Sequence, residues 1–234
     1  MRLRLLLCLA AAIPAAAETI DPVNDLRFGV AVQMAPKVSE NITPASGEAK
    51  RYNWEDGKAW GLRYDVMYVQ GMSQRGRPAS GFLWAVGASY GSTDITPGKY
   101  DTGGASSDNT REDVTLKYRQ YGVSAGVGWA SMPTDTEIGD LNWEILAIGR
   151  GGLCHAQTVA PGLSGERGED DGRFWEAGAT AGLVVTDSGW IFGLYVGWLY
   201  GRGSVHIDLP NDSTSSLRIT RNGAEAGAQL GFRF

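Results

Sequence analysis

The chain lacks several features that define common protein classes. It has only two cysteines and two histidines among 234 residues, and Cys8 lies within the apolar N-terminal segment. The remaining cysteine, Cys154, has no partner for an intramolecular disulfide, which excludes a disulfide-stabilised secreted domain. Beyond the first residues, no apolar run is long enough to cross a membrane as a helix.

The N-terminus has the pattern of a secretory signal peptide. Arg2 and Arg4 form a basic region, residues 5–13 an apolar region, and residues 15–17 a cleavage site of small residues. We predict that residues 1–17 are the signal peptide and that residues 18–234 form one domain. This mature chain carries 19 basic against 26 acidic residues, and its acidity argues against a nucleic-acid partner.

Eight segments of the mature chain alternate apolar and polar residues with a period of two. They cover residues 26–34, 60–68, 82–90, 121–129, 141–150, 175–185, 190–201 and 224–234. This period is typical of β-strands with one apolar face, and no helical period competes with it. The sequence therefore predicts an all-β fold.

Seven of the eight tryptophans lie on the apolar face, most of them near segment ends, as in the aromatic girdle of a membrane barrel. They are Trp60, Trp84, Trp129, Trp143, Trp175, Trp190 and Trp198. The opposite face combines many glycines with charged residues. These are Arg27, Arg63, Asp65, Glu144, Arg150, Glu176, Glu225 and Arg233. Inside a narrow barrel, small residues leave room for charged side chains that pair across the lumen. We therefore predict a transmembrane antiparallel up-and-down β-barrel of eight strands, with a polar network in its lumen.

The connections alternate in length. Those expected at 36–56, 92–112, 154–172 and 202–216 are long, whereas those at 71–80, 130–140 and 186–189 are short. Four long outer loops and short inner turns, with both termini in the periplasm, are typical of an outer-membrane barrel. A short hairpin within 36–56 or 92–112 would raise the number of strands to ten. A change of alternation phase also predicts a bulge near residues 119–120.

The signal peptide, the eight segments and the final strand, AEAGAQLGFRF, together resemble the small outer-membrane barrels of the OmpA-like and opacity-protein families. In those families the barrel assembly machinery recognises a C-terminal strand that ends in an aromatic residue. The resemblance assigns this signal to Leu230, Phe232 and Phe234. It implies a Gram-negative outer-membrane protein of the porin or surface-antigen type. Its expected partners are the assembly machinery, outer-membrane lipids, lipopolysaccharide and host or cell-surface ligands bound by the four loops.

We expect neither a cofactor, a metal site nor a catalytic site. The GVSAG motif at 122–126 lies within a strand, whereas the G-x-S-x-G nucleophile motif needs a strand, a turn and a helix. His155 and His206 lack the His-x-Ser pattern of lipid A deacylases, and the acidic run at 165–172 lacks the spacing of a calcium loop. A lipid-modifying deacylase or acyltransferase, a narrow porin and a soluble lipocalin-like carrier are the alternatives.

Basic residues gather near the expected outer rim. They are Lys50, Arg51, Lys58, Arg111, Lys117, Arg173, Arg202, Arg218 and Arg221. These side chains suit the phosphates of lipopolysaccharide, and ordinary surface charge explains them equally well.

Overall fold

The computed structural model describes residues 20–34, 36–43, 45, 50–54, 60–74, 77–78, 80–95, 116–159, 167–209 and 213–234. The predicted signal peptide, residues 1–17, lies outside these ranges. The strands are β1 Ile20–Met34, β2 Lys37–Thr43, β3 Lys50–Trp54, β4 Trp60–Gln74, β5 Arg77–Pro78, β6 Gly81–Ile95, β7 Leu116–Ala130, β8 Thr134–Thr136, β9 Gly139–Val159, β10 Arg167–Asp187, β11 Trp190–Leu209 and β12 Ser213–Arg233. Within the described ranges there is no helix long and apolar enough to cross a membrane.

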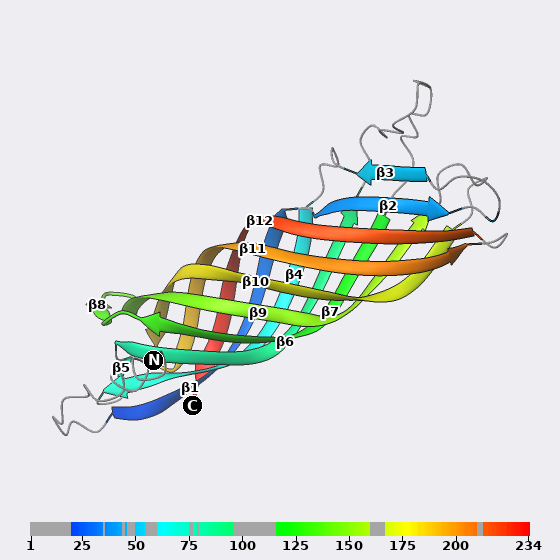
Figure 1. Ribbon diagram of the computed structural model, residues 1–234. Coiled ribbons are helices and arrows are strands. Elements are labelled where there is room, and N and C mark those ends of the chain that lie inside the picture. The colour runs from blue at the N-terminus through cyan, green and yellow to red at the C-terminus, as the bar shows by residue number, and fades with distance from the viewer. Residues whose placement is uncertain are drawn as a thin grey trace, which may run out of the picture.

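Eight strands close into an antiparallel ring in the order β1, β4, β6, β7, β9, β10, β11, β12, and β12 pairs back with β1 (Figure 1). This ring confirms the predicted eight-stranded up-and-down barrel. The strands β2 and β3 form a hairpin beside β12, inside the 36–56 range where an extra hairpin had been an alternative. We call this end of the barrel the outer end. The opposite end, which carries β5, β8 and the C-terminus, is called the turn end.

The strands of the ring are strongly tilted. The path of paired residues runs through Val30, Tyr64, Tyr90, Tyr121, Leu153, Arg173, Ser204 and Arg218. It reaches β12 ten residues away from Ala228, the direct partner of Val30. With a rise of about 3.3 Å per residue and about 4.8 Å between strands, this offset gives a tilt of ~41° from the barrel axis. A ring of eight strands leaves an interior just wide enough for side chains.

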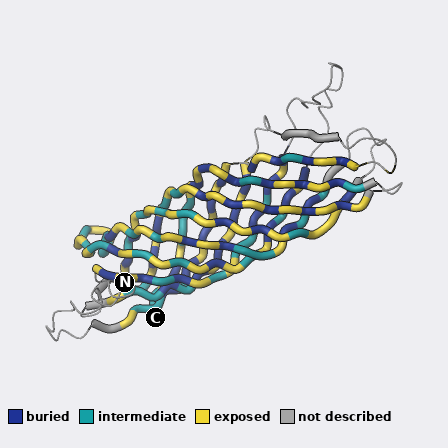
Figure 2. Tube along the Cα trace, viewed as in Figure 1, coloured by how far each residue is buried: buried dark blue, intermediate teal, exposed yellow. Residues whose placement is uncertain are grey.

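The four strands β9 to β12 are 20 or 21 residues long, whereas about 9–11 residues suffice to span a membrane. The predicted loops at 154–172 and 202–216 are therefore wrong over most of their length. In these segments burial still alternates from residue to residue (Figure 2), but the apolar residues now lie on the inward face. Val205 and Leu217 are buried inside the barrel, while Ser204 and Arg218 face outward. The prediction failed because it assumed that the apolar residues of every strand face outward. At the outer end they face inward.

The same inversion explains why the predicted bulge near residues 119–120 is absent. The strand β7 keeps one phase along its whole length, with its even-numbered residues turned inward. Leu116 and Tyr118 are buried inside the outer end, whereas Tyr121 and Val123 are exposed on the exterior. The apolar residues change face, and the backbone keeps its register.

The tight turn expected at 186–189 is present between β10 and β11. Ser188 and Gly189 have φ values of +49° and +84°, which lie in the left-handed region that suits a two-residue hairpin. Asp187 and Trp190 are paired on either side of the turn. Short connections therefore lie at the turn end.

The C-terminal residue allows a test of the predicted assembly signal. Phe234 donates its backbone N–H to Asn24 O at 3.0 Å, and its ring lies 6.5 Å from that of Tyr68. Deleting Phe234 should lower the heat-modifiable, folded protein in the outer-membrane fraction several-fold. Refolding of the purified chain in detergent should suffer less, because one hydrogen bond contributes only about 1 kcal/mol.

Phe234→Tyr is the matched control, because it keeps an aromatic end, and it should assemble normally. An unchanged outer-membrane level without Phe234 would exclude a signal at this residue. Equal losses in cells and in detergent would reduce the residue to a structural role.

Candidate functional site

The exterior of the ring is apolar. Val123, Leu194 and Val196 point outward with exposed fractions of 71 %, 69 % and 62 %. An apolar surface of this extent would aggregate in water and is suited to lipid. The lipocalin-like alternative is therefore wrong, because it needs these residues to face inward.

Most of the predicted girdle tryptophans lie at two levels on this exterior. Toward the turn end are Trp84, Trp129, Trp143 and Trp190, and toward the outer end are Trp60 and Trp175. Trp198 lies between the two levels, four residues nearer the turn end than Arg202, the register partner of Trp175. Tyrosines accompany both levels, since Tyr68 contacts Trp84 and Tyr200 contacts Trp175. Contact of these rings with the two membrane interfaces stays a prediction.

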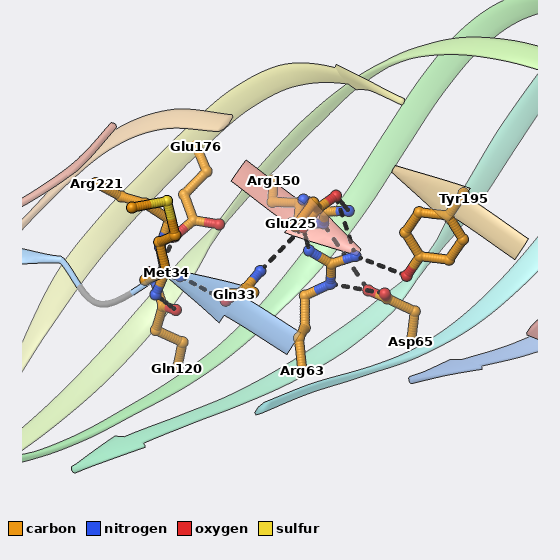
Figure 3. Close-up of polar contacts among 10 residues, drawn as sticks. All are labelled: Gln33, Met34, Arg63, Asp65, Gln120, Arg150, Glu176, Tyr195, Arg221 and Glu225. Atoms are coloured by element: carbon orange, nitrogen blue, oxygen red, sulfur yellow. Dashed lines mark hydrogen bonds and ion pairs between the residues drawn. The ribbon is translucent and has the colours of Figure 1, made fainter. Parts of the chain in front are cut away.

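A cluster of buried charges occupies the middle of the lumen (Figure 3). Arg63 donates from Nε to Asp65 at 2.7 Å, forms an ion pair with Glu225, and donates to the Tyr195 hydroxyl at 3.1 Å. Arg150 lies 3.8 Å from Asp65 and 3.9 Å from Glu225. The side chains of all four charged residues are at most 4 % exposed.

Arg221 extends this cluster toward the outer end. Its guanidinium lies 2.8 Å from Glu176 and donates to Gln33 at 2.6 Å. Gln33 in turn donates to Glu225, and Gln120 donates to Glu176. The prediction that Arg221 lies at the outer rim is wrong, because Arg221 is buried in the lumen. Arg221 shares the inward phase of Glu225 on β12, but the predicted strand began only at residue 224.

A second charged cluster closes the turn end of the lumen. Arg27 pairs with Glu144 at 2.6 Å and with Asp25 at 2.8 Å. Arg233 donates from Nε to Asp25 at 2.9 Å. The side chains of Asp25 and Arg27 are at most 5 % exposed. Five arginines and five carboxylates take part in the two clusters, so their charges balance.

All eight charged residues predicted to face the lumen belong to these two clusters. Sequence reasoning missed Asp25, Gln33, Gln120 and Arg221, and also Tyr195, which comes from a strand read as mostly apolar and glycine-rich. The inward phase would have found Asp25, Gln120 and Arg221, had each strand been drawn to its full length. Gln33 already lies on the inward face of the predicted segment 26–34, but it is uncharged and was not assigned to the network.

Apolar layers separate and cover the charged clusters. Between them lies a layer that includes Met67, Leu83 and Ile148, beside a cavity of about 40 Å³ that Arg63 and Arg150 also line. Arg150 Nε and Nη1 have no hydrogen-bond partner among the described residues, and a cavity of this size accommodates a few water molecules.

The outer end of the lumen is filled by twelve buried residues, which we call the outer plug. They are Val38, Ile42, Ile95, Leu116, Tyr118, Cys154, Ala156, Phe174, Val205, Ile207, Leu217 and Ile219. They come from seven strands, including the hairpin strand β2, which pairs edge to edge with the outer part of β12. Burial raises the pKa of the Cys154 thiol, which keeps it protonated and unreactive.

Polar residues face outward beyond the upper aromatic level. His155 Nδ1 lies 3.0 Å from Asp171, and His206 Nδ1 lies 2.8 Å from the Ser216 hydroxyl. Ser124 of the GVSAG motif is buried inside β7, away from both histidines. Within the described residues, no three acidic, histidine or cysteine side chains group as metal ligands.

The basic residues predicted at the rim divide into three groups. Lys117, Arg173, Arg202 and Arg218 are exposed on the outward face. Arg221 is buried, as described above. The side chains of Lys50 and Arg51, and Lys58 and Arg111 as a whole, lie outside the described residues.

The charge balance of the middle cluster can be tested by a double substitution. Glu225→Gln leaves Arg63 and Arg150 with Asp65 as their only carboxylate. It should lower the free energy of unfolding by about 3–5 kcal/mol. Adding Arg150→Gln removes the excess charge and should recover part of that loss. Urea unfolding in phospholipid vesicles measures both.

Arg119→Gln is the control, because its partner Asp94 is exposed and such pairs contribute about 1 kcal/mol or less. If Glu225→Gln were no more destabilising than this control, the cluster would not stabilise the barrel.

No protein-family model matches the chain, and no curated protein matches it in sequence. Among solved structures, OprG from Pseudomonas aeruginosa is 10 % identical, over 92 % of this chain and 97 % of its own, with a TM-score of 0.47. The outer-membrane protease OmpT from Escherichia coli is 10 % identical, over 92 % and 98 %, with a TM-score of 0.41. The attachment invasion locus protein Ail of Yersinia pestis, crystallised with a heparin analogue, is 12 % identical over 89 % and 99 %, with a TM-score of 0.32. At these identities no function transfers to this chain.

The chain's own geometry decides its class. A closed antiparallel ring satisfies every strand edge, as a structure in lipid must. Its strand number is even, its exterior is apolar, and its short turns share one end with the C-terminus. Single-chain barrels with these properties span the bacterial outer membrane. The chain is an integral outer-membrane β-barrel with a ring of eight strands.

Proposed function

We propose that the protein acts through its outer surface, in envelope structure, adhesion or partner binding, and that it neither transports nor catalyses. The observation that carries this proposal is the filled lumen. Two charged clusters with balanced charge occupy its middle and its turn end, an apolar layer lies between them, and the outer plug fills the outer end. A diffusing solute would have to break buried ion pairs and open the plug.

The outer plug also argues for a rigid outer surface. Each fully buried aliphatic or aromatic side chain contributes about 1.5–3 kcal/mol relative to an exposed one. The plug therefore stabilises the strands where they leave the lipid. On β10, eight residues separate Trp175 from the first residue of the strand, which corresponds to a wall of ~20 Å above the aromatic level. Such a wall, with the connections above it, offers a large surface to lipopolysaccharide or to a host or cell-surface ligand.

Conductance tests the proposal against the narrow-porin alternative. Purified barrel inserted into a planar lipid bilayer should give no stepwise current above the bare membrane, because the lumen has no continuous aqueous path. A general porin inserted under the same conditions is the positive control. Current steps of constant size, altered in size by Glu225→Gln, would contradict a sealed lumen.

One observation favours the lipid-modifying enzyme as a second candidate. His206 accepts or donates a hydrogen bond with the Ser216 hydroxyl, and both side chains face outward above the upper aromatic level. A serine with a histidine base can form an acyl-enzyme, but that chemistry also needs a group that orients the base. Asp171 is bonded to the other histidine, His155.

Fatty-acid release distinguishes the two candidates. The barrel in vesicles of phospholipid and lipid A should release no fatty acid above protein-free vesicles. Release that disappears in both Ser216→Ala and His206→Ala would establish the enzyme. Release that survives both changes would point to a contaminating activity.

A further inference from the structure

A row of alternating cations and hydroxyls crosses the exterior near the outer end. Arg173 on β10, Ser204 on β11, Arg218 on β12 and Ser39 on β2 are register partners, one strand after another. The four residues line a groove of about 580 Å³ on the outward face. The short serines beside the long arginines leave room in this groove.

The two arginines of this row are available to a ligand. Both face outward, and among the described residues neither guanidinium has an acidic partner. Arg119, on the far wall, is different because it pairs with Asp94 at 2.7 Å. The acid at the edge of the groove, Asp171, is bonded to His155. The groove therefore holds two guanidinium groups without an acidic partner and one carboxylate, that of Asp171, at its edge.

Hydroxyl and imidazole groups complete the lining. Ser216 and His206 form a hydrogen-bonded pair in the next row, and Asn41 lies opposite Ser216 across the β12–β2 pairing. These groups add hydrogen-bond donors to those of the two guanidinium groups. A tetrahedral oxyanion presents acceptors in several directions and suits such a set.

The height of the groove identifies the source of its ligand. Arg173 lies two residues beyond Trp175 on β10, which corresponds to ~5 Å along the membrane normal at a tilt of ~41°. The height of Arg202 lies between those of Trp175 and Arg173. Arg202 donates to the Tyr200 hydroxyl at 3.1 Å, and its guanidinium lies over the Tyr200 ring. The polar layer of a membrane is about 5–7 Å thick on each side. Because the tilt raises each successive strand by ~3 Å, Arg218 lies ~11 Å above Trp175. The groove thus begins in the headgroup layer of the outer leaflet at Arg173 and rises above it at Arg218.

We propose that this groove binds a phosphate group of an outer-leaflet glycolipid. Arg173 and Arg218 hold the phosphate oxygens, and Ser204 and Ser216 donate to those that remain. The acyl chains of the same lipid lie along the apolar exterior below, against Trp175 and Trp198. This inference rests on the proposed outer-surface function and names one partner of that surface.

The test measures binding of lipid A with two phosphates to the folded barrel in a neutral detergent, by native mass spectrometry. Arg173→Gln with Arg218→Gln should weaken binding at least tenfold. Lys117→Gln with Arg119→Gln removes the same charge from the opposite wall and should change binding less than threefold. A heat-shifted band in gel electrophoresis shows that each variant is folded.

Three results would overturn the proposal. The first is equal binding by the Arg173 and Arg218 variant and by the wild type. The second is equal binding of lipid A without phosphates, which would mean that the acyl chains alone are recognised. The third is equally tight binding of the phosphorylated sugar without acyl chains, which would identify a soluble anion as the ligand. None of these results contradicts the proposed outer-surface function of a sealed barrel. Only conductance through the lumen or catalytic activity would contradict that function.

Discussion

Pairing of β12 with β1 is the constraint on which the rest of the structure depends. An unpaired strand edge in lipid costs several kcal/mol for each backbone group, so the ring must close. Closure with eight strands and an offset of ten residues leaves a lumen just wide enough for side chains to fill. Side chains must therefore fill it, and every inward residue has to fit its neighbours across the barrel as well as along the sheet.

The filled lumen explains why its charges occur in balanced clusters. A buried guanidinium is tolerated only with carboxylates and hydrogen bonds around it. Arg63 on β4 has Asp65 beside it on the same strand and Glu225 on β12, two strands away around the ring. Arg27 on β1 has Asp25 beside it and Glu144 on β9, across the barrel. In both cases an i, i+2 pair is joined to a strand that is not its neighbour in the ring. The clusters thus connect strands that share no backbone hydrogen bonds, such as β1 and β9.

Sequence reasoning predicted the ring and the inward charges because lipid imposes a strong alternation on each strand. Arg27 and Glu225 could be recognised as inward from their neighbours alone. It failed where lipid ends. Cys154, Val205 and Leu217 lie in strands that continue into water, where apolar residues belong inside, so the segments looked like loops. The pairing of His206 with Ser216, or of Arg173 with Arg218 across Ser204, depends on strand register, which no single segment reveals.

The change of apolar face also sets where function can lie. Below this boundary, in the lipid, outward side chains must be apolar and inward charged side chains must form ion pairs. These two requirements leave little freedom for a binding site. Above it, the outer plug holds the same strands together from inside, and the outward positions become free to be polar. Arg173 and Trp175 lie on opposite sides of this boundary on one strand. A single continuous sheet can thus anchor a lipid by its chains and recognise it by its headgroup.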